Sequence, residues 1–334
     1  MKKIRWFITA CFIFMWLIGS TAWASLAIYY GDSNSSTLQL IISGVVAFIG
    51  LVTIMIFLFV SSWRNRLLSF HSIVFLMILL WWFNIQPSNT RDWQRDVNKL
   101  AYADVDGDLV TVHNIRNFSY QSEFDYTPEY YEKTYDLQKL EGLDLFAVYW
   151  MGPAIAHIIM SFDFGDQHLA VSIEARKEEG EAYSTIKGFF RQYELIYIAA
   201  DERDLIGLRT HYRNNPPEQV YRYRLKSTKV KKEGIKRLFM EYIKNINALH
   251  KAPDFYNTLL TNCTSVVWLN SRVNPDHLPF SWKILMSGYV PEYLYESGRL
   301  DQNLSLSELK DKAYVNPLVE KQAISSSFSS TIRR

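Results

Sequence analysis

The sequence predicts an α+β extracytoplasmic domain that follows three transmembrane helices, and three observations lead to this prediction. Nearly all of the charge lies downstream, because residues 1–90 contain five lysines and arginines but a single acid. Long uncharged apolar runs occupy the same 90 positions. The remaining residues alternate between strand-like and helix-like patterns, as mixed domains do. With 334 residues, the chain has room for a membrane domain at 1–88 and a second domain at 89–334.

Three apolar runs are predicted to cross the membrane. Residues 6–30 and 38–63 carry no charge, and each run exceeds the roughly 20 residues that span a hydrocarbon core of about 30 Å. Residues 67–83 form a shorter run, which the next residues can extend into the membrane interface. A bilayer accepts only helices or closed barrels, so uninterrupted runs of this length predict helices.

The positive charges predict the orientation of these helices. Lysines and arginines precede the first run and separate the second from the third, at Lys2, Lys3, Arg5, Arg64 and Arg66. The loop 31–37 contains none. The positive-inside rule therefore predicts a cytoplasmic N-terminus and places residue 88 onward outside. An alternative is that the first run is a cleaved signal peptide, because Ala22-Trp23-Ala24 resembles a cleavage site. The other two helices would still place residue 88 onward outside the cytoplasm.

The second domain is predicted to contain several strands and two main helices. Strand-like segments, separated by turn residues, cover 109–115, 146–150, 154–164, 168–176, 194–200 and 219–225. The last segment alternates as an edge strand does. Apolar residues spaced by three or four predict an amphipathic helix over 232–249, and a short apolar helix is expected over 264–271. The polar tail from Ser325 is expected to be loosely ordered.

The turn signal Gly165-Asp166 joins two of these strands into the clearest hairpin of the chain. A two-residue turn sets a register in which His157 lies opposite Glu174. Opposed residues share one face with Cβ atoms about 4.5–5.5 Å apart, so the carboxylate can orient the imidazole. His168 shares this face but lies roughly 20 Å along the strand from Glu174, and it is the alternative partner if the turn is longer. A surface ion pair without function is the other interpretation.

Two cysteines occur, and they lie in different domains. Cys11 falls in the first apolar run and Cys263 in the outer domain, so Cys263 is expected to be an unpaired thiol in an oxidising space. Thr261 or Asn262 is expected to cap the following helix. Cys263 would then occupy the first helical turn, where backbone N–H groups and the helix dipole lower the pKa of a thiol. A buried structural cysteine is the alternative unless a histidine lies beside it.

Several other kinds of site lack their required residues. Asp104, Asp106 and Asp108 begin like a calcium loop, but Ile115 stands where that loop needs a bidentate glutamate. The sequence contains no H-E-x-x-H, paired C-x-x-C or G-x-S-x-G motif. A net charge of +2 excludes the strongly basic footprint of a nucleic-acid-binding protein. We therefore expect no metal, no cofactor and no nucleic-acid partner.

An ordered set of short segments resembles a known bacterial family. The segments are residues 91–93, 113–118, 156–157, 161–162, 172–178, 190–195, 201–204 and 262–264. Together they resemble the periplasmic domain named after the N-terminal part of the Lnb lipoprotein N-acyltransferase, over nearly all of residues 90–334. That family is similar to permuted papain-like proteins, including NlpC-type peptidases, in which a strand histidine precedes a helix-borne cysteine.

The resemblance implies a permuted papain-like α+β domain with a Cys–His site that works through a thioester. Carried over to this sequence, it makes Cys263 the nucleophile and His157 the base; Glu174 is our choice of third member from the hairpin register. The implied protein sits in the bacterial inner membrane and faces the periplasm. It would be an acyltransferase or acyl hydrolase whose partners are membrane lipids or lipoproteins.

Two other functions stay open from the sequence. A cysteine peptidase or amidase acting on cell-wall peptides would use the same residues, but beside a polar groove rather than an apolar one. A non-enzymatic membrane scaffold that kept the fold would leave Cys263 buried and far from any histidine.

Overall fold

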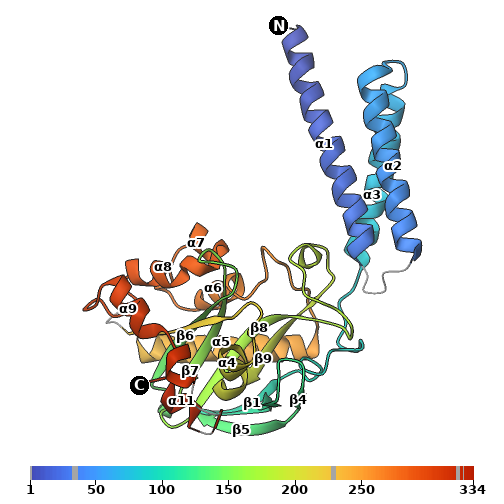
Figure 1. Ribbon diagram of the computed structural model, residues 1–334. Coiled ribbons are helices and arrows are strands. Elements are labelled where there is room, and N and C mark those ends of the chain that lie inside the picture. Colours follow the sequence, from blue (N-terminus) through green and yellow to red (C-terminus); the bar gives the residue numbers. More distant parts are fainter. Residues whose placement is uncertain (1, 32–36, 227–230, 321–323, 326) are drawn as a thin grey trace. The chain divides into compact units, whose positions relative to one another are not determined.

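The computed structural model of the chain describes residues 2–31, 37–226, 231–320, 324–325 and 327–334, and it divides into two compact units (Figure 1). The first, here called the helical unit, contains residues 1–88 together with 183–193. The second, the sheet unit, contains residues 89–182 and 194–334. Most of the loop 31–37, which entered the topology prediction, lies outside the described residues.

The helical unit contains the three predicted apolar helices, which are α1 (Lys2–Tyr30), α2 (Thr37–Phe59) and α3 (Arg64–Asn84). Each is long and apolar enough to cross a membrane, and many of their large apolar side chains are exposed, as lipid-facing side chains are. Gly50 permits a close approach of α1 and α2, because a Cβ at this position would collide with Thr21. Ser20 Oγ and His71 Nε2 lie 2.8 Å apart and join α1 to α3.

The segment 183–193 packs with the helices of this unit, although it lies between two strands of the sheet unit in the sequence. Phe190 stacks on Tyr30 at the end of α1, with ring centroids 5.9 Å apart. The Arg191 guanidinium lies 4.1 Å from the centroid of the Trp82 ring and donates to the Trp82 backbone carbonyl at 2.9 Å. The arginine thereby adds a second, charged donor to a carbonyl group in the last turn of α3, which also accepts the Ile85 N–H at 3.3 Å.

An eight-stranded sheet forms the core of the sheet unit (Figure 1). Its order is β1-β2-β9-β8-β7-β6-β10, with β5 also paired to β2, and only β2 and β9 run parallel. The strands are β1 (Tyr102–Asp106), β2 (Leu109–Arg116), β5 (Tyr130–Asp136), β6 (Gly142–Tyr149), β7 (Ala156–Asp163), β8 (His168–Arg176), β9 (Glu194–Ala200) and β10 (Gln219–Arg224). A separate hairpin consists of β3 (Ser119–Tyr120) and β4 (Tyr126–Thr127). Six strands match predicted segments, whereas β1, β3, β4 and β5 were not predicted.

The β7–β8 hairpin has the predicted two-residue turn and register. The ladder continues to Ile159, which lies opposite Ser172. His157 and Glu174 come two residues further along, beyond the last ladder pair. His168 stays at the opposite end of the hairpin from Glu174, so the alternative of a longer turn does not apply.

The helices of the sheet unit cover both faces of the sheet (Figure 1). They are α4 (Glu202–His211), α5 (Lys232–Lys251), α6 (Ser265–Ser271), α7 (Trp282–Leu285), α8 (Val290–Glu296), α9 (Leu306–Ala313), α10 (Asn316–Val319) and α11 (Phe328–Thr331). Single 3₁₀ turns occur at Leu137–Lys139 and Ser287–Tyr289, and a third, Lys187–Phe189, belongs to the helical unit.

Successive side chains of β7 point alternately to the two faces of the sheet, and helices cover both faces. Ile159 packs with Leu205 of α4 in the main core cluster. Phe162 instead packs edge-on against Phe239 of α5, with ring centroids 5.0 Å apart. Side chains two residues apart share a face, so His157 lies on the α4 side with Ile159.

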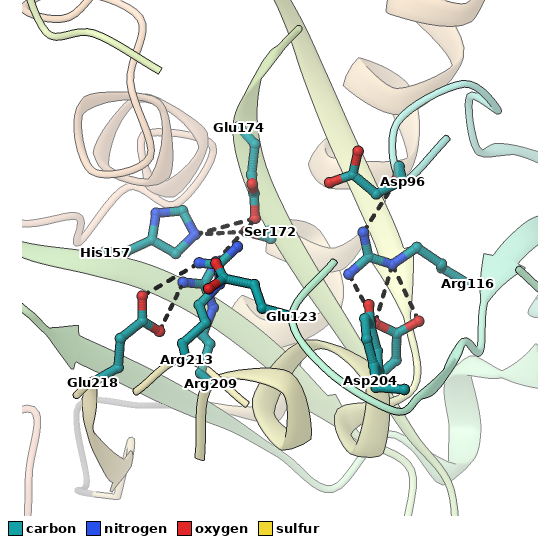
Figure 2. Close-up of polar contacts among 11 residues, drawn as sticks. Asp96, Arg116, Glu123, His157, Ser172, Glu174, Asp204, Arg209, Arg213 and Glu218 are labelled. Carbon is teal, nitrogen blue, oxygen red and sulfur yellow. Dashed lines mark hydrogen bonds and ion pairs between the residues drawn. The ribbon is translucent and has the colours of Figure 1, made fainter. Parts of the chain in front are cut away.

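A buried ion pair joins α4 to β2 (Figure 2). An Arg116 Nη2 atom lies 2.8 Å from Asp204 Oδ1, and the two side chains are 5% and 0% exposed. The same carboxylate accepts the Phe118 N–H at 2.7 Å and the Tyr120 hydroxyl at 2.9 Å. The buried carboxylate thus accepts hydrogen bonds from three partners, and these bonds offset the free-energy cost of burying its charge.

Asp204→Ala should lower the free energy of unfolding by about 3–5 kcal/mol, because it leaves the Arg116 charge buried without its partner. The midpoint of urea unfolding of the full chain in detergent measures this loss. Asp106→Ala is the control, since it removes an exposed carboxylate and should change stability by no more than about 0.5 kcal/mol. Equal shifts in the two variants would contradict a structural role for the buried pair.

The prediction of a loosely ordered tail from Ser325 is wrong for its described part. Phe328 and Ile332 are 4% and 2% exposed and belong to the main core cluster. The Arg333 guanidinium donates to the Glu202 carboxylate at 2.6 Å. The prediction followed the serine-rich composition and overlooked Phe328 and Ile332, which are four positions apart and therefore share one face of a helix.

Candidate active site

Three side chains at the end of the β7–β8 hairpin form a line of hydrogen bonds (Figure 2). His157 Nε2 lies 2.7 Å from Ser172 Oγ, and the Ser172 hydroxyl donates to Glu174 Oε1 at 2.7 Å. The direct distance from His157 Nε2 to Glu174 Oε1 is 3.5 Å. The structure therefore brings the two predicted residues together, but the carboxylate reaches the imidazole mainly through Ser172.

The single hydroxyl hydrogen of Ser172 shows which ring nitrogen of His157 carries a proton. A serine hydroxyl has one hydrogen, and that of Ser172 points to Glu174. Ser172 Oγ must then accept from the imidazole, so Nε2 carries a proton. The other ring nitrogen, Nδ1, is left to face the Cys263 thiol, whose charge and hydrogen bonding raise the pKa of His157.

A chain of charged side chains holds Glu174 in place (Figure 2). Arg209 bridges two carboxylates: its Nη2 atom lies 3.2 Å from Glu174 Oε1, and its Nη1 atom lies 3.3 Å from Glu218 Oε2. Arg213 lies 3.3 Å from the other oxygen of Glu218. Burial alone would raise the pKa of Glu174, but the His157 hydrogen bond and the charges of His157 and Arg209 hold this pKa well below its usual value. Glu174 is therefore ionised at neutral pH.

Cys263 lies in the turn directly before α6, and Asn262 supplies the capping hydrogen bonds of that helix. Asn262 Oδ1 accepts the N–H groups of Thr264 at 2.8 Å and Ser265 at 2.9 Å. The prediction that Cys263 occupies the first helical turn is wrong, because α6 begins two residues later, at Ser265. The two capped amides are occupied by Asn262, so they are not available to a substrate oxygen.

Cys263 and His157 shift each other's pKa in opposite directions. Burial raises the pKa of Cys263, but the His157 charge and hydrogen bond, helped by the Ile158 N–H and the Thr264 hydroxyl, lower it below its usual value. Burial lowers the pKa of His157, but the Cys263 charge and hydrogen bonds with Cys263 and Glu174 raise it to about 9. Each group therefore favours the charged form of the other, a thiolate beside an imidazolium.

The alkylation of Cys263 should stay fast at a lower pH than that of an ordinary thiol. A maleimide reacts with the thiolate, so its rate should fall only when the pH drops below the lowered pKa of Cys263. His157→Ala removes the imidazolium and should move this fall to higher pH. Mass spectrometry of the Cys263 peptide after timed labelling gives both profiles, and identical profiles would argue against the ion pair.

An apolar cavity of about 320 Å³ lies near the thiol; neither Cys263 nor His157 lines it, but two residues that contact the thiol do. Thr264 is part of its wall, and Thr264 Oγ1 lies 3.7 Å from Cys263 Sγ. Ile158, whose N–H bonds to the same sulfur, is another wall residue. Ten further wall residues are apolar and come from β6, β7, α5, α6, α7 and α8: Leu143, Leu145, Met160, Ile235, Leu238, Val267, Trp268, Ile284, Val290 and Leu294. The wall also contains polar and charged side chains, among them Lys231, Arg237, Asp276, His277 and Arg299.

The alternative partner His168 lies outside this site. His168 Nε2 is 3.4 Å from Asp163 Oδ1, at the turn end of the hairpin. The remaining predicted residues, His157, Glu174 and Cys263, are brought together. Within the described ranges, no group of three or more histidine, cysteine, aspartate or glutamate side chains could hold a metal ion.

Neither Ser172 nor Arg209 was predicted from the sequence to belong to the site. A signal for Ser172 existed, since it lies two residues from Glu174 on the same face and diagonal to His157, within reach of a long side chain. Arg209 offered no such signal, because its contact with Glu174 depends on how α4 packs against β8.

Comparison with known families identifies the domain. The family model described as the Lnb N-terminal periplasmic domain matches residues 126–288. This part of the chain belongs to the Lnb N-terminal periplasmic domain family. The matched range contains His157, Ser172, Glu174 and Cys263. No significant match was found among curated proteins or among solved structures, so the permuted papain-like fold stays a prediction.

The three apolar helices complete this picture. An Lnb N-terminal periplasmic domain preceded by three helices able to cross a bilayer is a membrane-anchored periplasmic domain of the inner membrane. The predictions of transmembrane helices and a periplasmic domain are therefore confirmed.

Proposed function

We propose that the protein is a thiol acyltransferase or acyl hydrolase that acts on acyl groups of membrane lipids or lipoproteins. One observation carries the proposal: a thiol paired with a charged imidazole touches two wall residues of an apolar cavity, Ile158 and Thr264. A nucleophile thus lies close to an apolar cavity of a kind that suits an acyl chain.

The proposed reaction has two steps. The Cys263 thiolate attacks the carbonyl carbon of an acyl ester, and a carbon–sulfur bond forms while the carbonyl electrons move to oxygen. When the intermediate collapses, the carbon–oxygen bond breaks and the His157 Nδ1–H gives its proton to the leaving alcohol. Neutral Nδ1 then takes a proton from an amine or water, which attacks the thioester and releases the thiolate.

Stabilisation of the developing oxyanion needs a donor near the thiol. The backbone N–H groups of Thr264 and Ser265 lie next to the thiol, but they bind Asn262. We assign this role to the backbone N–H of Cys263 itself, which the capping bonds of Asn262 leave unused.

The lining of the cavity favours lipid over cell-wall peptide. The larger part of the cavity surface is apolar, which suits an acyl chain, and polar and charged side chains, such as Lys231, Arg237 and Arg299, form the rest of the wall. The contact between Cys263 and His157 also argues against the scaffold interpretation, which expects the thiol far from any histidine.

The decisive experiment traps the intermediate. The full chain in proteoliposomes would be incubated with phospholipid that carries a labelled acyl chain, and the protein then digested for mass spectrometry. We expect an acyl group on Cys263 that neutral hydroxylamine releases, and its transfer to an added diacylated lipopeptide or to water. Absence of the acyl group, together with cleavage of cell-wall peptide by the same sample, would support the peptidase alternative instead.

We further propose that the N-terminus is cytoplasmic, on the distribution of lysine and arginine between the loops. A reporter that is active only in the periplasm should work when fused after Thr90 and fail when fused before Lys2. Activity of the second fusion alone would reverse the orientation.

A further inference from the structure

Exposed apolar side chains concentrate around α6 and α7. Thirteen large hydrophobic side chains are exposed among the described residues of the sheet unit, and eight of them lie within residues 259–286. These eight, here called the apolar rim, are Leu259, Leu260, Leu269, Val273, Phe280, Trp282, Leu285 and Met286. Scattered exposed hydrophobic residues are normal, but such a concentration marks an interaction surface.

Polar contacts beneath the rim hold it in shape. Asn257 Oδ1 accepts the N–H groups of both Leu259 and Leu260 at 3.0 Å, which fixes the turn that presents the two leucines. Next to Trp282, Lys283 turns inward and donates to two glutamates of α8, Glu292 and Glu296, at 2.6 Å each. The rim is therefore a preformed surface, with Leu260 66% and Trp282 57% exposed.

The rim borders the candidate active site. Leu260 comes three residues before Cys263 in the same turn region. At the other end of the rim, Ser287 Oγ accepts the N–H of Ala156 at 2.9 Å, and Ala156 is the neighbour of His157. α6 and α7 lie together at one end of the sheet unit (Figure 1).

The covalent chain ties this end of the sheet to the membrane helices. Only residues 85–88 separate α3 from Asn89, and four residues span at most roughly 14 Å. Asn89 Oδ1 lies 3.2 Å from Arg176, the last residue of β8. The insertion 183–193, which belongs to the helical unit, runs directly into Glu194, the first residue of β9.

We propose that the apolar rim docks on the outer leaflet of the bilayer that holds α1, α2 and α3. Tryptophan, phenylalanine and leucine are the side chains that bind the headgroup and acyl boundary, and the binding strength grows with the apolar area buried. The occupant is lipid rather than a second copy of the chain, because the short tethers keep the rim within reach of the bilayer in every molecule. The docking of the apolar rim does not depend on the thiol chemistry. Its consequence, that docking brings the cavity close to lipid acyl chains, rests on the proposed function.

Labels that report depth in the membrane test the proposal. In a Cys11→Ser, Cys263→Ser background, a nitroxide is attached at Trp282→Cys or Leu260→Cys, with one full chain per nanodisc of phosphatidylethanolamine and phosphatidylglycerol. The matched control is Asp166→Cys, in the exposed turn more than about 20 Å along the hairpin from His157. Compared with this control, both rim labels should collide several-fold more with oxygen and several-fold less with a water-soluble nickel chelate.

Two independent rim positions keep the test valid if one substitution disturbs folding. If the rim labels collide with the nickel chelate as often as the label at position 166 does, the proposal is overturned. Protection that arises only when two chains share a disc would also overturn it and would assign the rim to a second copy. Because both cysteines are absent from these variants, the result does not depend on whether the proposed acyl chemistry occurs.

Discussion

Cys263→Ser should lower the rate of acyl transfer or hydrolysis by roughly 10³-fold or more, while the protein keeps its fold. The change is nearly isosteric, but a serine hydroxyl does not ionise near neutral pH and cannot form the ion pair that lowers the pKa of Cys263. The measurement is the turnover of labelled phospholipid by the full chain in proteoliposomes, with circular dichroism as the check on folding.

Cys11→Ser is the matched control for this result. Cys11 lies on α1 and is exposed on that helix, away from any residue of the candidate site in the sequence. Its removal should leave the rate within about twofold, as expected for an exposed position without function. Full activity of Cys263→Ser would remove Cys263 as the nucleophile and with it the thioester mechanism.

The relation between His157 and Glu174 could be predicted because a hairpin is a local structure. The turn length sets the register, and the register decides which residues share a face. The ladder stops at Ile159 and Ser172, so the two residues meet through the Ser172 hydroxyl rather than as a flat cross-strand pair. The face was predictable from the sequence, but the hydrogen-bonding partner depends on how the strands separate.

The meeting of Cys263 with His157 could not be derived from patterns in the sequence. More than one hundred residues separate them, and their contact depends on how α6 docks beside β7. Periodicity reports which face of an element is apolar, but it does not report which other element covers that face. Here the family resemblance suggested the pair, and the structure supplied the contact.

The cavity and the apolar rim show the same limit. The cavity wall gathers residues from six elements between Leu143 and Leu294, so no single stretch of sequence indicates it. The rim comes from one stretch, but its leucines and aromatic residues have the same composition as a core segment. Only exposure in the folded chain separates an outward apolar surface from a buried one.

His157→Ala should lower the rate by roughly 10²–10⁴-fold, the range expected when a general base is lost. Glu174→Gln and Ser172→Ala should cost less, because each leaves the imidazole in place but weakens the bond that holds it. These residues form one hydrogen-bonded unit, so adding either change to His157→Ala should produce little further loss. His168→Ala, which removes a histidine at the other end of the same hairpin, should leave the rate nearly unchanged.

The pH profile separates positioning from a general loss of structure. Hydrogen bonding with Glu174 helps to raise the pKa of His157 to about 9, so the rate should fall as the pH rises through that value and the imidazolium loses its proton. Glu174→Gln removes a contribution that raises this pKa, and the alkaline fall should therefore begin at lower pH. Ser172→Thr keeps the hydroxyl and should restore most of the activity lost in Ser172→Ala. If the alkaline limb stays at the same pH in Glu174→Gln, Glu174 does not act on His157, and the line of hydrogen bonds from His157 to Glu174 serves only the stability of the hairpin.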